Sequence, residues 1–176
     1  MSALKELKIV WDERFGSDDF TIFIVLIDGV DFRVWEKPTE RYNIDKGLSS
    51  HKSKHGALRY LIALFIWDSS CVFVHGPVKP GEVPDIEHWR IALKQRMQQH
   101  PGKMAIGDRG YITSEPDESG IIATPNPRDP TQLKEYKVRV RQRHESFYSR
   151  LTNFKILQDT FRFPRENISI LCNLFV

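Results

Sequence analysis

The stretch FTIFIVLIDGVDFRVWE, Phe20–Glu36, decides the fold. Its first seven residues are β-branched, aromatic or otherwise strand-favouring, which is typical of a strand buried on both faces. The run then reaches Asp28, and a carboxylate there must be paired, bound to a metal or placed at the rim of the sheet, because an unpaired buried charge is costly. Asp28-Gly29 is also the strongest local signal for a type I′ hairpin. The sequence therefore predicts either one long strand from Phe20 to Trp35 or two strands meeting at this dipeptide.

Length and composition limit the class of protein. A chain of 176 residues fits one domain with a sizeable core, and 40% apolar with 28% charged residues is typical of a soluble globular protein. No run approaches the roughly 18 apolar residues of a membrane span, and the N-terminus lacks a signal-peptide core. We expect an intracellular protein, nuclear or cytoplasmic, with no membrane partner. Cys71 and Cys172 stand far apart and are expected to be reduced core residues.

Charge is unevenly distributed along the chain. The net charge of the chain is +3. The segment from Lys134 to Lys155 has seven cations and two acids, a balance of 7 − 2 = +5. The remainder of the chain therefore has a net charge of 3 − 5 = −2. A basic helix on a mildly acidic domain is most often a solvated face, and it can also be a face that binds phosphates.

Apolar periodicity and turn signals predict the remaining elements. Residues 1–19 form a lead-in, and 37–56 a polar, basic loop. Strands are expected at 58–67, 71–75, 103–107 and 120–124, and helices at about 86–97, with Asp85 as N-cap, and at about 131–157. The tail after Pro164 could be a strand or a helix. Meander strands followed by a crossover helix imply an α/β fold with a mixed sheet flanked by helices, the order of an RNase H-like domain.

The long helix carries an apolar stripe at helical period. Its members are Leu133, Tyr136, Val140, Phe147, Leu151 and Phe154. At about 100° per residue, Glu145 lies about 160° from Phe147 and therefore off the stripe. A glutamate among arginines is otherwise typical of a surface ion pair, for instance with Arg141 four residues earlier.

Two apolar strands run into an aspartate. Asp28 follows the first strand's apolar run, and Asp108 follows the short strand KMAIG. Neighbouring strand ends in an open α/β sheet form the crevice where ligands bind, so the two carboxylates could share a cation. Hard cations such as Mg²⁺ take oxygen ligands and keep several waters, which leaves room for a substrate phosphate.

Four motifs, taken together and in order, resemble the Harbinger-type group of DDE transposases. They are IDGVDFRVWE at Ile27–Glu36, SHKSKHGALRY at Ser50–Tyr60, GDRGY at Gly107–Tyr111 and RQRHESFYSRLTNFKIL at Arg141–Leu157. The resemblance covers most of the chain from Ile27 to about Leu157. It implies an RNase H-like fold in which two aspartates and a glutamate bind two Mg²⁺ or Mn²⁺ ions for cleavage and strand transfer of DNA.

Carried over by position, the resemblance makes Asp28, Asp108 and Glu145 the catalytic metal ligands. Lys52, Lys54, Arg141 and Arg143 would contact backbone phosphates, which orient DNA without reading its sequence. Residues 20–176 would form the DDE endonuclease domain. The helix-turn-helix region that precedes this domain in full-length relatives has no counterpart in residues 1–19, so DNA specificity would come from a separate DNA-binding protein, and a homo-oligomer is possible.

Other functions stay open at this stage. The chain has Asp31 where the family tends to have His, and Leu61 where it tends to have an acid. One alternative is a catalytically silent, transposase-derived module that binds DNA or protein. Another is an RNase H-like enzyme that processes nucleotides or RNA and uses the same metal site.

Overall fold

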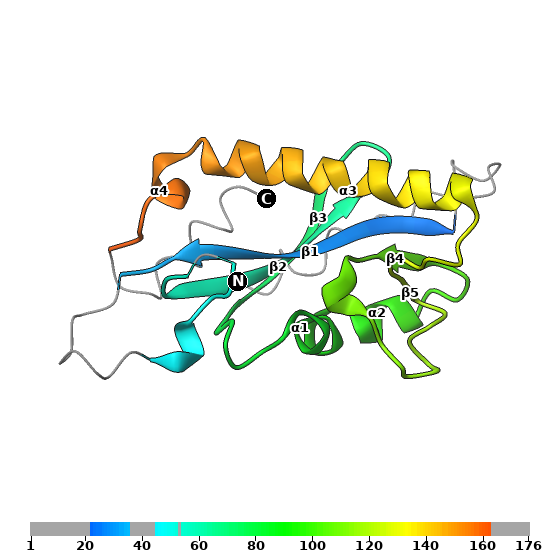
Figure 1. The fold of residues 1–176 in the computed structure, drawn as a ribbon, viewed down its shortest axis with the longest axis horizontal. Coiled ribbons are helices and arrows are strands. Elements are labelled where there is room, and N and C mark those ends of the chain that lie inside the picture. The colour runs from blue at the N-terminus through cyan, green and yellow to red at the C-terminus, as the bar shows by residue number, and fades with distance from the viewer. Residues whose placement is uncertain (1–21, 36–44, 53, 163–176) are drawn as a thin grey trace.

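The computed structural model describes residues 22–35, 45–52 and 54–162 of the chain. The expected lead-in, most of the first half of the polar loop, the C-terminal tail and Cys172 lie outside these residues. The described part is an α/β structure with one mixed five-stranded sheet between helices (Figure 1). No helix in these segments is long and apolar enough to cross a membrane.

The sheet has the strand order β3-β2-β1-β4-β5. The strands are β1 (Phe23–Arg33), β2 (Ala57–Phe65), β3 (Cys71–Val78), β4 (Met104–Ile106) and β5 (Ile122–Ala123). The first three form the expected antiparallel meander, while β4 pairs in parallel with β1 and β5 in parallel with β4. The fold class predicted from the sequence, an α/β fold with a mixed sheet flanked by helices, is therefore confirmed.

β1 passes through Asp28-Gly29 without turning. Asp28 pairs with Ile62 and Gly29 with Leu61, in the same antiparallel ladder that joins β1 to β2 from Val25 to Arg33. The alternative of two strands meeting in a hairpin was wrong. The apolar residues on either side of the dipeptide gain partners on β2 and in the helices, and this burial outweighs the local preference of Asp-Gly for a turn.

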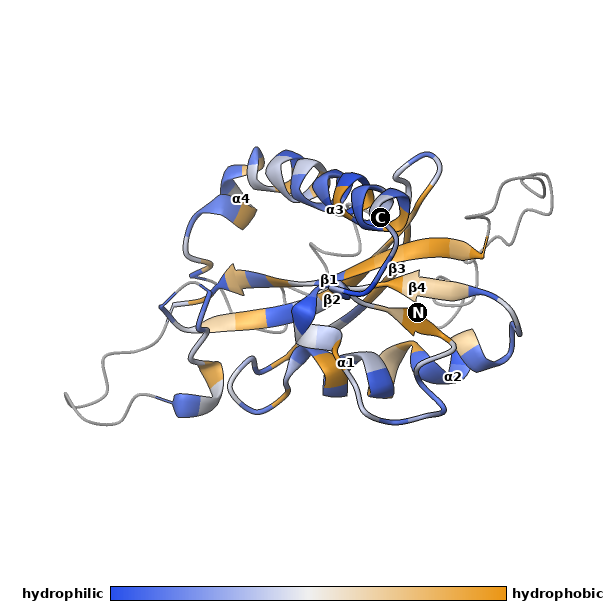
Figure 2. Ribbon diagram, turned by 45° about the vertical axis from the view of Figure 1, so that its right-hand side comes forward, coloured by the Kyte–Doolittle hydropathy of each residue, from blue (hydrophilic) through white to orange (hydrophobic). Residues whose placement is uncertain are grey.

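Helices cover both faces of the sheet. On one face lie α1 (Asp85–Ala92) and α2 (Lys94–Gln98), which pack Trp89, Leu93 and Met97 against the strands. On the other face α3 (Thr131–Thr152) runs along β1, followed by the short α4 (Lys155–Gln158) (Figure 1). The outer side of α3 is hydrophilic and the strands are mostly hydrophobic, so the core lies in two layers, one on each side of the sheet (Figure 2).

Each of the two expected helices is shorter in the structure than the apolar periodicity of the sequence predicted. The first is interrupted at Leu93, and the second ends at Thr152 because Phe154 adopts an extended conformation before α4. Asp85 is not an N-cap: Pro84 holds that position, and no side chain caps the helix. The Asp85 carboxylate is used elsewhere, in the crevice described below.

Candidate active site

A crevice opens in the sheet where β1 leaves β4. The parallel pairing of these strands ends at Leu26 and Ile106, and beyond this point the edge of β1 is open until Phe161 bonds to Arg33 O and bridges to Val34. On β1, Asp28 lies two residues beyond Leu26. Asp108 lies two residues beyond Ile106, the last paired residue of β4. This is the position at which open α/β sheets bind ligands.

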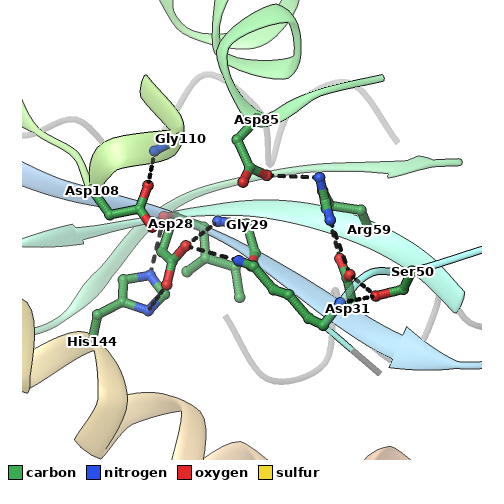
Figure 3. Close-up of polar contacts among 11 residues, drawn as sticks. Asp28, Gly29, Asp31, Ser50, Arg59, Asp85, Asp108, Gly110 and His144 are labelled. Carbon is green, nitrogen blue, oxygen red and sulfur yellow. Dashed lines mark hydrogen bonds and ion pairs between the residues drawn. The ribbon is translucent and has the colours of Figure 1, made fainter. Parts of the chain in front are cut away.

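The two aspartates are held by local backbone contacts. Asp28 Oδ1 accepts a hydrogen bond from Gly29 N at 2.7 Å, and the side chain is 35% exposed. Asp108 is the N-cap of a 3₁₀ turn (Arg109–Tyr111), and its Oδ1 accepts from Gly110 N at 2.8 Å. Both carboxylates are therefore fixed in orientation while part of each stays open to the crevice (Figure 3).

A third carboxylate, Asp85 at the start of α1, enters the crevice between two glycines. A Cβ on Gly29 would lie 2.5 Å from Asp85 Oδ1, and a Cβ on Gly110 would lie 3.0 Å from both Asp85 Oδ2 and Asp108 Oδ1. Asp85 Oδ2 and Asp108 Oδ1 are therefore no more than about 6 Å apart. A Cβ at Gly29 would force the Asp85 carboxylate to move, and a Cβ at Gly110 would be in tight contact with both Asp85 and Asp108.

A buried arginine balances this group of acids. Arg59 lies opposite Asp31 in the ladder, donates from Nε to its Oδ1 at 2.7 Å and from Nη2 to its Oδ2 at 3.0 Å, and places Nη1 2.8 Å from Asp85 Oδ1 (Figure 3). Ser50 Oγ donates to Asp31 as well. Burial would raise the pKa of Asp31, but the hydrogen bonds from Arg59 and Ser50 hold it below its ordinary value.

The pKa of Asp85 is shifted in the opposite direction, above its ordinary value. Burial raises its pKa, with Lys52 and Arg59 acting against the shift and the carboxylates of Asp28 and Asp108 adding to it. The three acids thus lie within electrostatic range of one another. Such a group favours a cation among its members, because it brings negative charges together in a partly desolvated place.

Lys52 supplies one such cation from the polar loop. Its Nζ donates to Gly29 O at 2.9 Å and lies 3.4 Å from Asp28 Oδ1. Burial would lower the pKa of Lys52, but the charges of Asp28, Asp85 and Asp31 hold it above its ordinary value. The lysine is charged and sits at the mouth of the crevice, where a phosphate could also reach it.

A pocket of about 650 Å³ lies between β1 and α3 and begins at Asp28. Glu145 and His144 of α3 both line it, together with Lys52 and Tyr148. The Glu145 side chain is solvent-exposed where it lines this pocket. Of the predicted ligands, Asp28 and Glu145 therefore share one pocket, while Asp108 approaches the same crevice from the opposite side of β1's open edge.

His144 is a site residue that sequence reasoning missed. Its side chain is 4% exposed, with Nδ1 3.8 Å from Asp28 Oδ2 and Nε2 3.4 Å from Ile62 O. The signal was the gap of seven residues between Val140 and Phe147 in the apolar stripe. His144 lies one turn after Val140 and fills that gap, so α3 turns this histidine toward the sheet and leaves Glu145 beside it.

The other predicted phosphate contacts lie apart from the pocket. Lys54 is exposed in the same loop as Lys52, with a φ of 56° that allows its N–H to reach Ser50 O. Arg141 and Arg143 are half-buried on α3 and do not line the pocket.

The donor chemistry fits a hard divalent cation at the crevice. No three His, Cys, Asp or Glu side chains in the described segments lie close enough to hold an ion as a group. Mg²⁺ needs fewer, since it binds through one or two carboxylates and keeps waters. Asp28 and Asp108 offer such oxygens at neighbouring strand ends, and Glu145 offers another in the pocket that begins at Asp28. These three residues remain the predicted ligands of Mg²⁺ or Mn²⁺.

Comparison of the chain with family models, curated proteins and solved structures found no match.

Proposed function

We propose that this protein is a divalent-metal-dependent DNA endonuclease of the DDE transposase type, with an RNase H-like fold. DNA is its proposed partner and the nucleus its proposed location, with sequence specificity supplied by a separate DNA-binding protein. The proposal makes Asp28, Asp108 and Glu145 the metal ligands of a reaction that cleaves phosphodiester bonds.

One observation carries this proposal: the placement of the three acids on the sheet topology. Asp28 lies on the central strand β1, Asp108 directly follows its parallel neighbour β4, and Glu145 lies on α3, which covers β1. The strand order, with an antiparallel meander followed by two parallel strands, supports the RNase H-like part of the proposal. Carboxylates at these strand ends face the crevice in which a phosphate and its metal ions would be bound.

The chain's own residues supply position and charge in the proposed reaction. Two bound ions would activate the attacking water or 3′-hydroxyl and stabilise the leaving oxygen. Gly29 N and Gly110 N fix the orientation of Asp28 and Asp108. Lys52, at the mouth of the crevice, would contact a non-bridging phosphate oxygen. Since the protein forms no covalent intermediate, its contribution is electrostatic and geometric.

Metal-dependent nicking of supercoiled plasmid tests the proposal. The purified protein should convert supercoiled to open-circular DNA with Mn²⁺ or Mg²⁺ and stop when EDTA is added. Glu145→Gln should reduce nicking by at least about a hundredfold, the order expected for losing a group that stabilises transition-state charge. Glu135→Gln is the matched control, because Glu135 is an exposed glutamate on the same helix outside the pocket. Equal loss in both variants would contradict the role of Glu145.

A second candidate is a catalytically silent, transposase-derived binding module. Two observations favour it: Lys52 already balances the charge of Asp28, and no three potential ligands in the described part of the chain converge on one point. In that case the protein would bind DNA with unchanged affinity in EDTA and would not nick it under any metal condition. The plasmid assay, run beside a binding assay, separates the two candidates.

A further inference from the structure

The two oxygens of Asp28 have different surroundings. Oδ1 accepts from Gly29 N at 2.7 Å and faces the Lys52 ammonium. Oδ2 points toward α3, where His144 Nδ1 lies 3.8 Å away (Figure 3). This separation is too long for a hydrogen bond, so Oδ2 and Nδ1 face each other without a bond between them.

The backbone decides which ring nitrogen of His144 carries the proton. Nε2 lies 3.4 Å from Ile62 O, and because a carbonyl oxygen can only accept, we assign the proton of the neutral ring to Nε2. Nδ1 then presents a lone pair to Asp28 Oδ2. Two electron-pair donors that face each other across a gap inside a pocket are arranged for a cation, and metal-bound histidines commonly donate their other N–H to a backbone carbonyl in this way.

We propose that His144 is a further metal ligand, which binds through Nδ1 the same divalent ion as Asp28 Oδ2. Two ligand atoms at about 2.1 Å from one ion lie about 3.0 Å apart at octahedral angles and about 3.4 Å apart at tetrahedral angles. The observed 3.8 Å therefore needs a movement of less than about 1 Å. The ring is held by its packing, with Phe147 edge-on at 6.4 Å, so the movement belongs to the half-open Asp28.

A nitrogen ligand changes which ion the site prefers. Imidazole binds the later transition metals better than Mg²⁺, whereas an all-carboxylate site suits Mg²⁺, Ca²⁺ and Mn²⁺. His144 thus shifts the preference of the crevice away from Mg²⁺ and toward transition-metal ions. The inference rests on the proposed metal site but not on its catalytic activity.

The direct test is electron spin echo spectroscopy of the wild-type chain loaded with one equivalent of Mn²⁺. A bound histidine nitrogen modulates the echo, and growth with ¹⁵N-histidine should change the modulation frequencies. The signal should disappear in His144→Asn and persist in His100→Asn, which alters a half-buried histidine at the end of α2. Calorimetry should show Mn²⁺ affinity falling at least about tenfold in His144→Asn, with a smaller change for Mg²⁺.

The outcomes separate this inference from the proposed function. Wild-type protein with bound Mn²⁺ and no nitrogen modulation overturns the role of His144, even if the protein nicks DNA, and so does a protein that binds no Mn²⁺. Nitrogen modulation that is lost in His144→Asn supports the inference even if no nicking is seen. The overturning outcomes use the wild-type chain alone, and circular dichroism that shows His144→Asn to be folded makes its loss of the signal a test of His144 itself.

Discussion

Arg59 shows how single residues hold the crevice together. Its guanidinium bridges Asp31 on β1 and Asp85 on α1, and the side chains of Arg59 and Asp31 are 7% and 3% exposed. Breaking a buried ion pair by removing one partner leaves the other charge uncompensated in a poorly solvated place. The arginine therefore matters for stability as well as for the position of Asp85.

Replacing Arg59 tests this account. Arg59→Met should lower the free energy of unfolding by about 3–5 kcal/mol, because Asp31 and Asp85 lose their common partner. Lys79→Met is the control, since Lys79 pairs with Asp45 and Glu82 at the surface and such exposed pairs contribute little to stability. Both are measured by urea denaturation. A loss for Arg59→Met as small as that of the control would show that the buried network contributes little.

At this scale the sequence predicted some site residues and missed others for a physical reason. Asp28 and Asp108 could be found because each ends an apolar run, and that pattern is local. Asp85 was assigned to a helix cap, and His144 was lost among charged residues. Their roles depend on Gly29, Gly110 and the opposite helix, which are far away in the sequence, so a local pattern cannot reveal them.

Among the elements, β1 is the clearest case of tertiary contacts overriding a local signal. Asp-Gly favours a turn in isolation, but β1 pairs with β2 from Val25 to Arg33 and with β4 from Phe23 to Leu26. The helices behave similarly at their ends, where the periodic pattern continues past Leu93 and Thr152 although the regular helix does not. Periodicity thus predicted which elements exist better than where they end.

A buried glutamate tethers the loop before β5 to α1 and α2. Glu118 is fully buried and accepts from Arg90 Nε and Lys94 Nζ, each at 2.8 Å, and from Thr113. The hydrogen bonds from Arg90 lower its pKa from 4.5 to about 2, against the effect of burial. The folded pKa lies below the unfolded one, so the stabilisation is complete above about pH 4.5 and is lost as the pH falls toward about 2.

This linkage predicts an acid-sensitive tether. The free energy of unfolding should fall between about pH 4.5 and about pH 2, and Glu118→Gln should be less stable at pH 7 with a shallower decline in that interval. Glu115→Gln, a change at an exposed position of the same loop, should keep the wild-type slope. Denaturation at a series of pH values measures this. Identical slopes for wild type and Glu118→Gln would contradict the assignment.

For the whole molecule, the uneven charge distribution makes a prediction about DNA binding. The basic residues gather on α3, and the crevice with its acids lies beneath that helix. In the proposed complex, the duplex would contact Arg141 and Arg143 on α3, outside the pocket, while the scissile phosphate lies in the crevice. Contacts of this kind release counterions and make the affinity fall steeply with salt concentration.

Salt titration of duplex binding measures these contacts. Arg141→Gln and Arg143→Gln should each reduce the slope of log K against log salt by about 0.9, the value for one lost phosphate contact. Lys103→Gln changes a lysine just before β4, outside α3, and should leave the slope unchanged. If all three variants keep the wild-type slope, DNA does not lie along this helix.

The central claim is that Asp28 and Asp108 together form a metal-dependent cleavage site, and one assay tests it most directly. Wild-type protein and Asp108→Ala are incubated with supercoiled plasmid and Mn²⁺, after circular dichroism has shown that both are folded. The account predicts open-circular product with the wild type, and none above background with Asp108→Ala. Nicking at the wild-type rate by Asp108→Ala would contradict it.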